Sequence, residues 1–158
     1  MRSILAVTEA ASDHNLTTLD NVKLDLGITD GNSDARIIAW IRQASGIAVR
    51  YCDRPLARET VTETFRHTGH QREYLWRDSL SSHWQHCTNT GGLRLTRYPI
   101  ISVASVTVDG NLIDPSLYEF DETELYLLTA DGHPDAWRFG RSIVVAYTAG
   151  YAVPIVDA

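Results

Sequence analysis

The stretch YPIISVASVTVDGN, residues 98–111, carries the clearest strand pattern in this chain. β-Branched residues alternate along it with smaller side chains, and Asp109-Gly110 near its end is typical of a tight hairpin turn. Apolar residues fall on both faces of the alternation, which predicts a strand that is covered on both sides. Helical patterns dominate the sequence before this stretch, and short strand patterns follow it.

Two helical patterns lie in the first third of the chain. The first covers residues 19–26, where Thr17 or Thr18 can cap the helix and Gly27 can end it. The second runs from about residue 34 to residue 51. Its expected buried face repeats every three or four residues and consists of Ile37, Ile38, Ile41, Ala44, Ala48 and Tyr51. Trp40 and Ile47 widen the apolar side, so this helix is either enclosed by its own domain or faces a neighbouring subunit.

The remaining patterns indicate an α+β protein in which an N-terminal helical pair is followed by a compact antiparallel β unit. Residues 1–15 lack periodicity and are expected to form a flexible arm. The helical part then covers residues 16–56, and the β unit covers residues 57–158. Within the β unit, the polar segment 68–92 is expected to be a long excursion. The other predicted strands lie at about 58–67, 118–120, 125–128 and 141–149.

Charge excludes one class of function for the C-terminal part. The chain has a net charge of −6, and residues 98–158 contain two arginines against nine acidic residues. Tight binding to duplex DNA requires a basic surface that displaces counterions, so this part is not expected to bind DNA tightly. The chain also has no apolar run of about 18 residues that could form a transmembrane helix.

A histidine-rich pattern in the excursion suggests one alternative function. His67 and His70 are separated by two residues, as are His83 and His86, and Cys87 follows directly. Paired ligands at this spacing suit tetrahedral zinc, although structural zinc sites usually contain more thiolates than one. Histidines in a solvated polar loop explain the same pattern.

No pattern in the chain indicates catalysis. The sequence lacks a nucleophile motif, a phosphate-binding loop and a dinucleotide-binding glycine pattern. Asp121, Glu122 and Glu124 could hold a divalent cation, but no EF-hand pattern surrounds them and a solvated turn is the simpler interpretation. We therefore expect a protein that is not an enzyme and has no cofactor.

Four segments, taken in order, resemble the phage head–tail connector family, whose members are also called adaptor or head-completion proteins. They are LTTLDNVKLDLGI at 16–28, VRYCDRPL at 49–56, RYPIISVASVTVDG at 97–110 and VAYTAGYAVP at 145–154. Each segment is a soft motif of apolar residues with Pro or Gly. The resemblance therefore depends on their succession over residues 16–154.

The resemblance implies a structural role in tailed phages or gene transfer agents. Such proteins form a homo-oligomeric ring, typically of twelve copies, beneath the portal protein. The ring extends the channel through which DNA passes without sequence-specific binding, and it docks the next tail or stopper protein. The expected location is therefore the head–tail interface of the virion, after synthesis in the host cytoplasm. Members commonly continue into further helices, whereas this sequence ends at Ala158, so no portal-contact residues are carried over.

Within this hypothesis, two groups of residues are candidates for function. The expected oligomer interface consists of Ile37, Trp40, Ile41, Ile47, Tyr147 and Tyr151. The expected acidic residues of the channel wall are Asp121, Glu122 and Glu124. The alternative is a small metal-binding or carbohydrate-active domain that uses His67, His70, His83 and His86.

Overall fold

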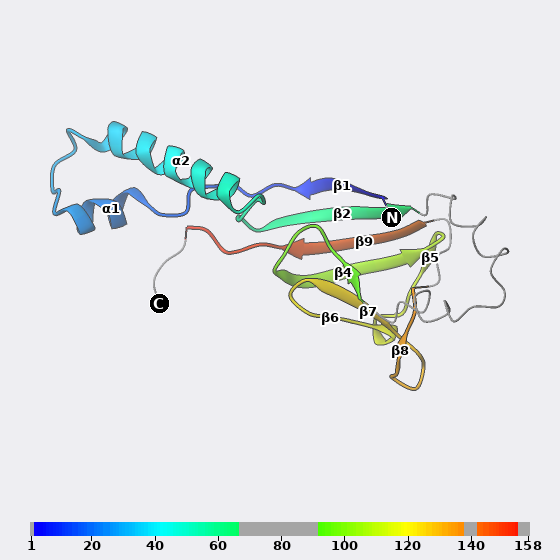
Figure 1. The fold of residues 1–158 in the computed structure, drawn as a ribbon. Helices are drawn as coiled ribbons and strands as arrows, with labels where there is room; N and C mark the ends of the chain where they lie inside the picture. Colours follow the sequence, from blue (N-terminus) through cyan, green and yellow to red (C-terminus); the bar gives the residue numbers. More distant parts are fainter. Residues whose placement is uncertain (1, 67–91, 138–141, 155–158) are drawn as a thin grey trace, which may run out of the picture.

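The computed structural model describes residues 2–66, 92–137 and 142–154. It contains an N-terminal pair of helices and two antiparallel sheets, so the predicted α+β class is confirmed. The helical pair extends beyond the ends of the long strands instead of lying across a sheet face (Figure 1). This arrangement separates the chain into a β unit with its own core and a helical part that protrudes from it.

The helices begin and end where local sequence signals place them. Helix α1 (Leu19–Leu26) is capped by Thr18, whose Oγ1 accepts a hydrogen bond from the Asn21 N–H at 3.1 Å. It ends at Gly27, which has a left-handed φ of 66°. Helix α2 (Asp34–Tyr51) follows, and Lys23 Nζ lies 2.8 Å from Asp34 Oδ1, which ties the two helices together.

The larger sheet has five strands in the order β1-β2-β9-β4-β5, where the edge strand β1 is Arg2–Glu9, and all neighbours are antiparallel. Its central strands are β2 (Glu59–Arg66), β9 (Ser142–Ala149) and β4 (Ile100–Val108), and β5 (Asn111–Leu112) returns along β4. Asp109 and Gly110 both have positive φ, of 52° and 86°. This backbone suits a two-residue hairpin turn, so the predicted turn is confirmed.

The smaller sheet packs against the larger one. It has the order β3-β7-β6, where β3 is Leu93–Arg94, β7 is Glu124–Leu128 and β6 is Tyr118–Phe120, and β8 (Pro134–Asp135) also pairs with β7. A short 3₁₀ helix, Pro115–Leu117, leads into β6. The shared core is built from Val61, Phe65, Leu93, Leu95, Ile100, Val106, Leu125, Trp137, Ile143, Val145, Tyr147 and Ala149.

The N-terminal segment differs from the prediction. Residues 1–15 were expected to form a flexible arm, but Arg2–Glu9 forms strand β1, which pairs with β2 at the edge of the larger sheet. The pairing supplies the backbone hydrogen bonds that the segment cannot make alone, and Leu5 packs against the core. The flexible-arm prediction is therefore wrong for residues 2–9.

Strand β4 also differs from its predicted environment. Ile100 and Val106 are buried, but Ile101 is 44% exposed, and Ser102 and Ala104 are exposed as well. The pairing with β9 is irregular between Ile100 and Ser102 and again between Val103 and Ser105. Irregularities of this kind shift the alternation of side chains, so only one face of the strand meets the core. The prediction of a strand covered on both sides is wrong.

Gly150→Ala should destabilise the chain strongly. Gly150 has a φ of +106°, and an added Cβ would lie 2.5 Å from the Ala57 carbonyl oxygen. We expect a loss of about 2 kcal/mol or more in the free energy of unfolding, because backbone strain and a backbone clash act together. Chemical denaturation measures the change.

Gly46→Ala is the matched control for this prediction. Gly46 lies within α2, and apart from its chain neighbours and the backbone of its own helix, no described atom lies within 4 Å of an added Cβ. Alanine should therefore raise the free energy of unfolding by about 0.5–1 kcal/mol. Equal effects of the two substitutions would contradict the account of Gly150.

Candidate functional site

Helix α2 carries an exposed apolar stripe. Trp40, Ile47 and Tyr51 are 54%, 60% and 91% exposed, and the exposed Ala44 lies between the first two. The four residues follow one another at spacings of four, three and four, so they share one face of the helix over about three turns. We call Trp40, Ala44, Ile47 and Tyr51 the α2 stripe. Two further large apolar side chains, Leu24 and Leu26 of α1, are 81% and 58% exposed.

The side of α2 that adjoins the stripe is used inside the chain. Ile37 and Ile41 are 1% and 7% exposed, and the buried Ser45 Oγ accepts a hydrogen bond from the Leu16 N–H at 3.0 Å. Burial removes Ile37 and Ile41 from the predicted oligomer interface. Trp40 and Ile47 keep their place in that prediction because they remain exposed.

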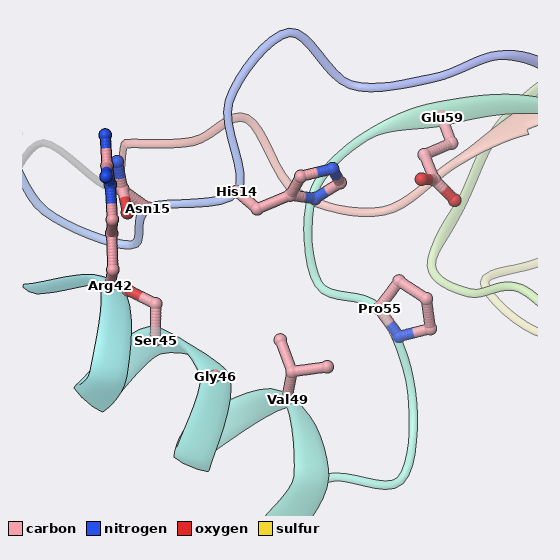
Figure 2. A pocket seen from close by; sticks show the side chains of 8 residues that line it. All are labelled: His14, Asn15, Arg42, Ser45, Gly46, Val49, Pro55 and Glu59. Atoms are coloured by element: carbon pink, nitrogen blue, oxygen red, sulfur yellow. The ribbon is translucent and has the colours of Figure 1, made fainter.

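A hollow of about 430 Å³ opens beside α2, between residues 14–15, the second half of the helix and the beginning of β2 (Figure 2). We call this hollow the slot. Gly46, Val49 and Pro55 contribute its apolar lining. Arg42 and Glu59 lie at opposite ends of it, with the ring of His14 between them (Figure 2). The full lining is His14, Asn15, Arg42, Ser45, Gly46, Val49, Pro55 and Glu59.

Glu59 is a buried carboxylate with unused hydrogen-bonding capacity. Its side chain is 9% exposed, and its Oε2 has no hydrogen-bond partner among the residues that the structure describes. Arg97 Nη2 lies 3.8 Å from this oxygen, too far for a hydrogen bond. Arg97 Nε is also buried without a hydrogen-bond partner in the described part of the chain. Glu59 and Arg97 therefore form a buried ion pair at 3.8 Å that lacks the hydrogen bonds such groups normally make.

A second buried carboxylate, Glu63, is fully satisfied. Tyr147 Oη donates to Glu63 Oε2 at 2.8 Å, and the Thr96 N–H donates to the same oxygen at 3.0 Å. Thr96 Oγ1 donates to Glu63 Oε1, and Tyr147 Oη accepts from the Arg97 N–H at 3.1 Å. Burial, together with the charge of Glu63, raises the pKa of the Tyr147 phenol. Tyr147 is 0% exposed, so it is not part of a surface, and the structure corrects its assignment to the oligomer interface.

Tyr151 remains 42% exposed but is partly held by Arg54. The Arg54 guanidinium lies 3.9 Å from the centroid of the Tyr98 ring and 5.7 Å from that of Tyr151. It also donates to the Tyr98 carbonyl oxygen at 2.7 Å and to Tyr151 Oη at 3.3 Å. These contacts join the segment after α2 to the segments before β4 and after β9.

The acidic residues between β6 and β7 form a turn. Asp121 Oδ1 accepts hydrogen bonds from the N–H groups of Thr123 and Glu124, at 2.7 and 2.8 Å, and these bonds lower the pKa of Asp121. Tyr126 Oη donates to Asp121 Oδ2 at 2.9 Å, which raises the pKa of Tyr126 to about 12. Asp121 and Glu122 are exposed and Glu124 is half-buried. The turn interpretation is confirmed, and the assignment of Asp121, Glu122 and Glu124 to a channel wall stays a prediction.

The histidine pattern cannot be located in the structure. His67, His70, His83 and His86 lie outside the described residues, so the metal-binding and carbohydrate-active alternative stays a hypothesis. Within residues 2–66, 92–137 and 142–154, no three His, Cys, Asp or Glu side chains are grouped so that they could hold a metal ion. No helix in the described part of the chain is long and apolar enough to cross a membrane.

Comparisons with known proteins do not identify a family. No protein-family model matches the chain. No curated protein matches it significantly, and no solved structure does either. Evidence about function therefore comes from the residues and geometry of this chain.

Tyr147→Phe should destabilise the fold. The substitution removes the hydroxyl that donates to Glu63 and accepts from the Arg97 N–H. The buried Glu63 carboxylate and the Arg97 N–H would each lose a hydrogen-bond partner. We therefore expect the free energy of unfolding to fall by about 1–3 kcal/mol. Tyr126→Phe, which removes from β7 a hydroxyl that donates to the exposed Asp121, should cost less in the same urea denaturation. A smaller effect at Tyr147 than at Tyr126 would contradict the role of the buried network.

The raised pKa of Tyr147 also predicts a pH dependence. The unfolded phenol loses its proton near pH 10, whereas the folded phenol keeps its proton to higher pH. The contribution of this group to stability is therefore complete below about pH 10 and falls as the pH rises above it. Denaturation at pH 9, 10 and 11 should give a steeper fall for the wild-type chain than for Tyr147→Phe. Parallel curves would argue against this assignment.

Proposed function

We propose that this chain is a structural subunit of a head–tail connector ring in a tailed phage or a gene transfer agent. In this role it sits beneath the portal protein, extends the DNA channel and docks the next tail component. The observation that carries the proposal is the protruding helical pair with its exposed α2 stripe (Figure 1). The order of the four connector-like segments supports the same assignment.

The exposure of the stripe favours association between copies. Burying a large apolar side chain contributes about 1.5–3 kcal/mol, and Trp40, Ile47 and Tyr51 leave at least half of their surface in water. Soluble monomers rarely expose large apolar side chains next to one another on their surface. Trp and Tyr are also enriched in the cores of protein interfaces. Among the described residues, the apolar core of the β unit includes no residue of the helices. In the proposed ring, a neighbouring copy covers the stripe.

The charge of the β unit supports a position around a DNA channel. Residues 98–158 hold nine acidic side chains and two arginines, and Asp121 and Glu122 are exposed. A negatively charged wall repels the phosphate backbone, so DNA can pass without adhering. This arrangement calls for no catalytic group, in agreement with the non-enzymatic role that we propose.

Localisation in the particle tests the proposed function directly. Particles from the source should be imaged at the portal vertex, and density for this chain should be sought with the symmetry of the vertex imposed and then released. A ring of this chain below the portal is the expected result. Particles in which the chain is absent from that vertex would overturn the proposal.

Trp40→Asp should abolish ring formation while leaving the chain folded. Trp40 is 54% exposed, so a charge there costs little in the monomer, but it would be buried without a partner in the assembly. We expect monomers by analytical ultracentrifugation and an unchanged circular dichroism spectrum. Leu112→Asp is the matched control, because Leu112 is 69% exposed on β5, away from the helical pair. Rings that persist in Trp40→Asp, or that are lost equally in Leu112→Asp, would contradict the role of the stripe.

A further inference from the structure

Strand β1 leaves one long side of its backbone open. It lies at the end of the larger sheet and, among the residues that the structure describes, pairs with β2 alone (Figure 1). Its register with β2 is regular from Arg2 to Val7. Alternate residues of an edge strand point their backbone N–H and C=O groups away from the sheet. The partner that satisfies these groups is another extended strand.

The side chains of β1 do not protect this edge. Residues 3–8 contain no charged residue and no proline. Ile4 and Val7 are 57% and 45% exposed, and they lie on opposite faces of the strand. Natural edge strands are usually protected by charges, prolines or bulges, and β1 has only the register shift that follows Val7. A long, uncharged and apolar edge of this kind favours strand pairing.

The other edges in the described part of the chain are less suitable. At the far edge of the larger sheet, β5 has only two residues, and β4 behind it pairs irregularly with β9 at two places. In the smaller sheet, β3 and β8 have two residues each and β6 has three. Short strands and bulges both disfavour the addition of another strand. The strand of this chain that best fits an open β1 is therefore a second β1.

We propose that two copies pair through β1, antiparallel and about a two-fold axis beside Leu5, so that their larger sheets join into one. Opposite residues of paired strands lie on the same face, so a two-fold axis normal to the sheet must pass a residue that faces its own copy. With the axis at Leu5, residues 3–7 of both strands are paired. The inference does not rest on the proposed ring, because a two-fold contact joins two copies and does not continue around a ring.

The side chains of β1 complement one another in this register. Ile4 lies opposite Ala6 of the second copy, and Ser3 lies opposite Val7 of the second copy, so that each larger side chain meets a small one. The half-buried Leu5, which packs against the core, meets itself. No like charges face each other over these residues. The pairing therefore covers apolar surface on both faces of the strand.

Sedimentation in a concentration series tests the contact separately from the ring. One pair of strands buries less surface than a standard interface, so the contact should be weak. The Trp40→Asp chain, which is expected to be monomeric in dilute solution, should therefore form dimers when it is concentrated. A chain that stays monomeric at every concentration would overturn this inference and leave the ring standing. A wild-type chain that never forms rings would overturn the proposed function, and dimers of it linked through β1 would still support this inference.

Disulfide formation tests the register. In Trp40→Asp with Cys52→Ser and Cys87→Ser, Leu5→Cys should give a linked dimer on mild oxidation, because directly opposed Cβ atoms lie about 4.5–5.5 Å apart. Val7→Cys is the matched control, since the two copies of position 7 would lie four residues apart along the strands, or about 13 Å. Equal linkage at the two positions, or none with Leu5→Cys, would overturn the two-fold pairing.

Hydrogen exchange reports the pairing without a cross-link. A strand paired on one side protects alternate amides, whereas a strand paired on both sides protects consecutive amides. Consecutive protection over residues 3–7 is expected in concentrated solution, and alternate protection after dilution. Ala6→Lys, at an exposed position, should give alternate protection even when concentrated, because it places like charges on neighbouring strands. Leu112→Lys on β5 is the matched control and should change nothing. Consecutive protection that survives dilution or Ala6→Lys would overturn the pairing.

Discussion

The β unit depends on the hydrogen bonding of one buried carboxylate. Glu63 is 0% exposed, and an ionised carboxylate in such a position costs several kcal/mol unless donors replace the lost water. Thr96 supplies two donors and Tyr147 supplies the third, while the Arg97 N–H donates to the Tyr147 hydroxyl. The network joins β2 and β9 to the segment between β3 and β4. It therefore fixes the path by which the chain passes from the smaller sheet to the larger one.

In the part of the chain that the structure describes, no comparable network holds the helical pair. The Lys23–Asp34 ion pair joins its two helices, and the Leu16–Ser45 hydrogen bond holds the preceding segment against α2. At the other end, the contacts of Arg54 fix the exit from α2. These are few polar contacts near the surface, and individual contacts of this kind contribute little. The β unit thus completes its own core within one chain, whereas the helices leave their largest apolar side chains in water.

The sequence predicts the elements well where local signals decide them. The cap at Thr18, the left-handed Gly27 and the Asp109-Gly110 turn each depend on a few neighbouring residues, and all three were predicted. Strand β1 was missed because an edge strand acquires its structure from pairing with β2, more than fifty residues away. The sequence of residues 1–15 has no hydrophobic periodicity that would indicate this pairing.

The two faces of α2 show a subtler limit of sequence reasoning. Apolar residues at spacings of three and four were assigned to one buried face, but only Ile37 and Ile41 are buried, whereas Ala44 and Tyr51, within about 40° of Ile37 around the helix axis, are exposed. The helical period indicates which side chains share a face, but it does not indicate how many turns of that face a neighbouring segment covers. The slot was missed because three separate segments form it. One signal was present, however. The alternation of β2 puts Glu59 and Glu63 on the same face as Val61 and Phe65. Carboxylates on a face that meets the core need hydrogen-bond donors or cations beside them.

The difference between the two halves has a consequence for assembly. When identical copies dock head to tail, the rotation from one copy to the next decides whether the assembly closes into a ring or continues as a filament. If the contact lies on α2, that rotation is transmitted to the β unit through the short segment after the helix. Arg54 holds this segment against Tyr98 and Tyr151, and Asp53 beside it adopts a left-handed φ of 51°. The α2 stripe would then set whether copies associate, and the joint at Arg54 would set how the β units are arranged around the axis.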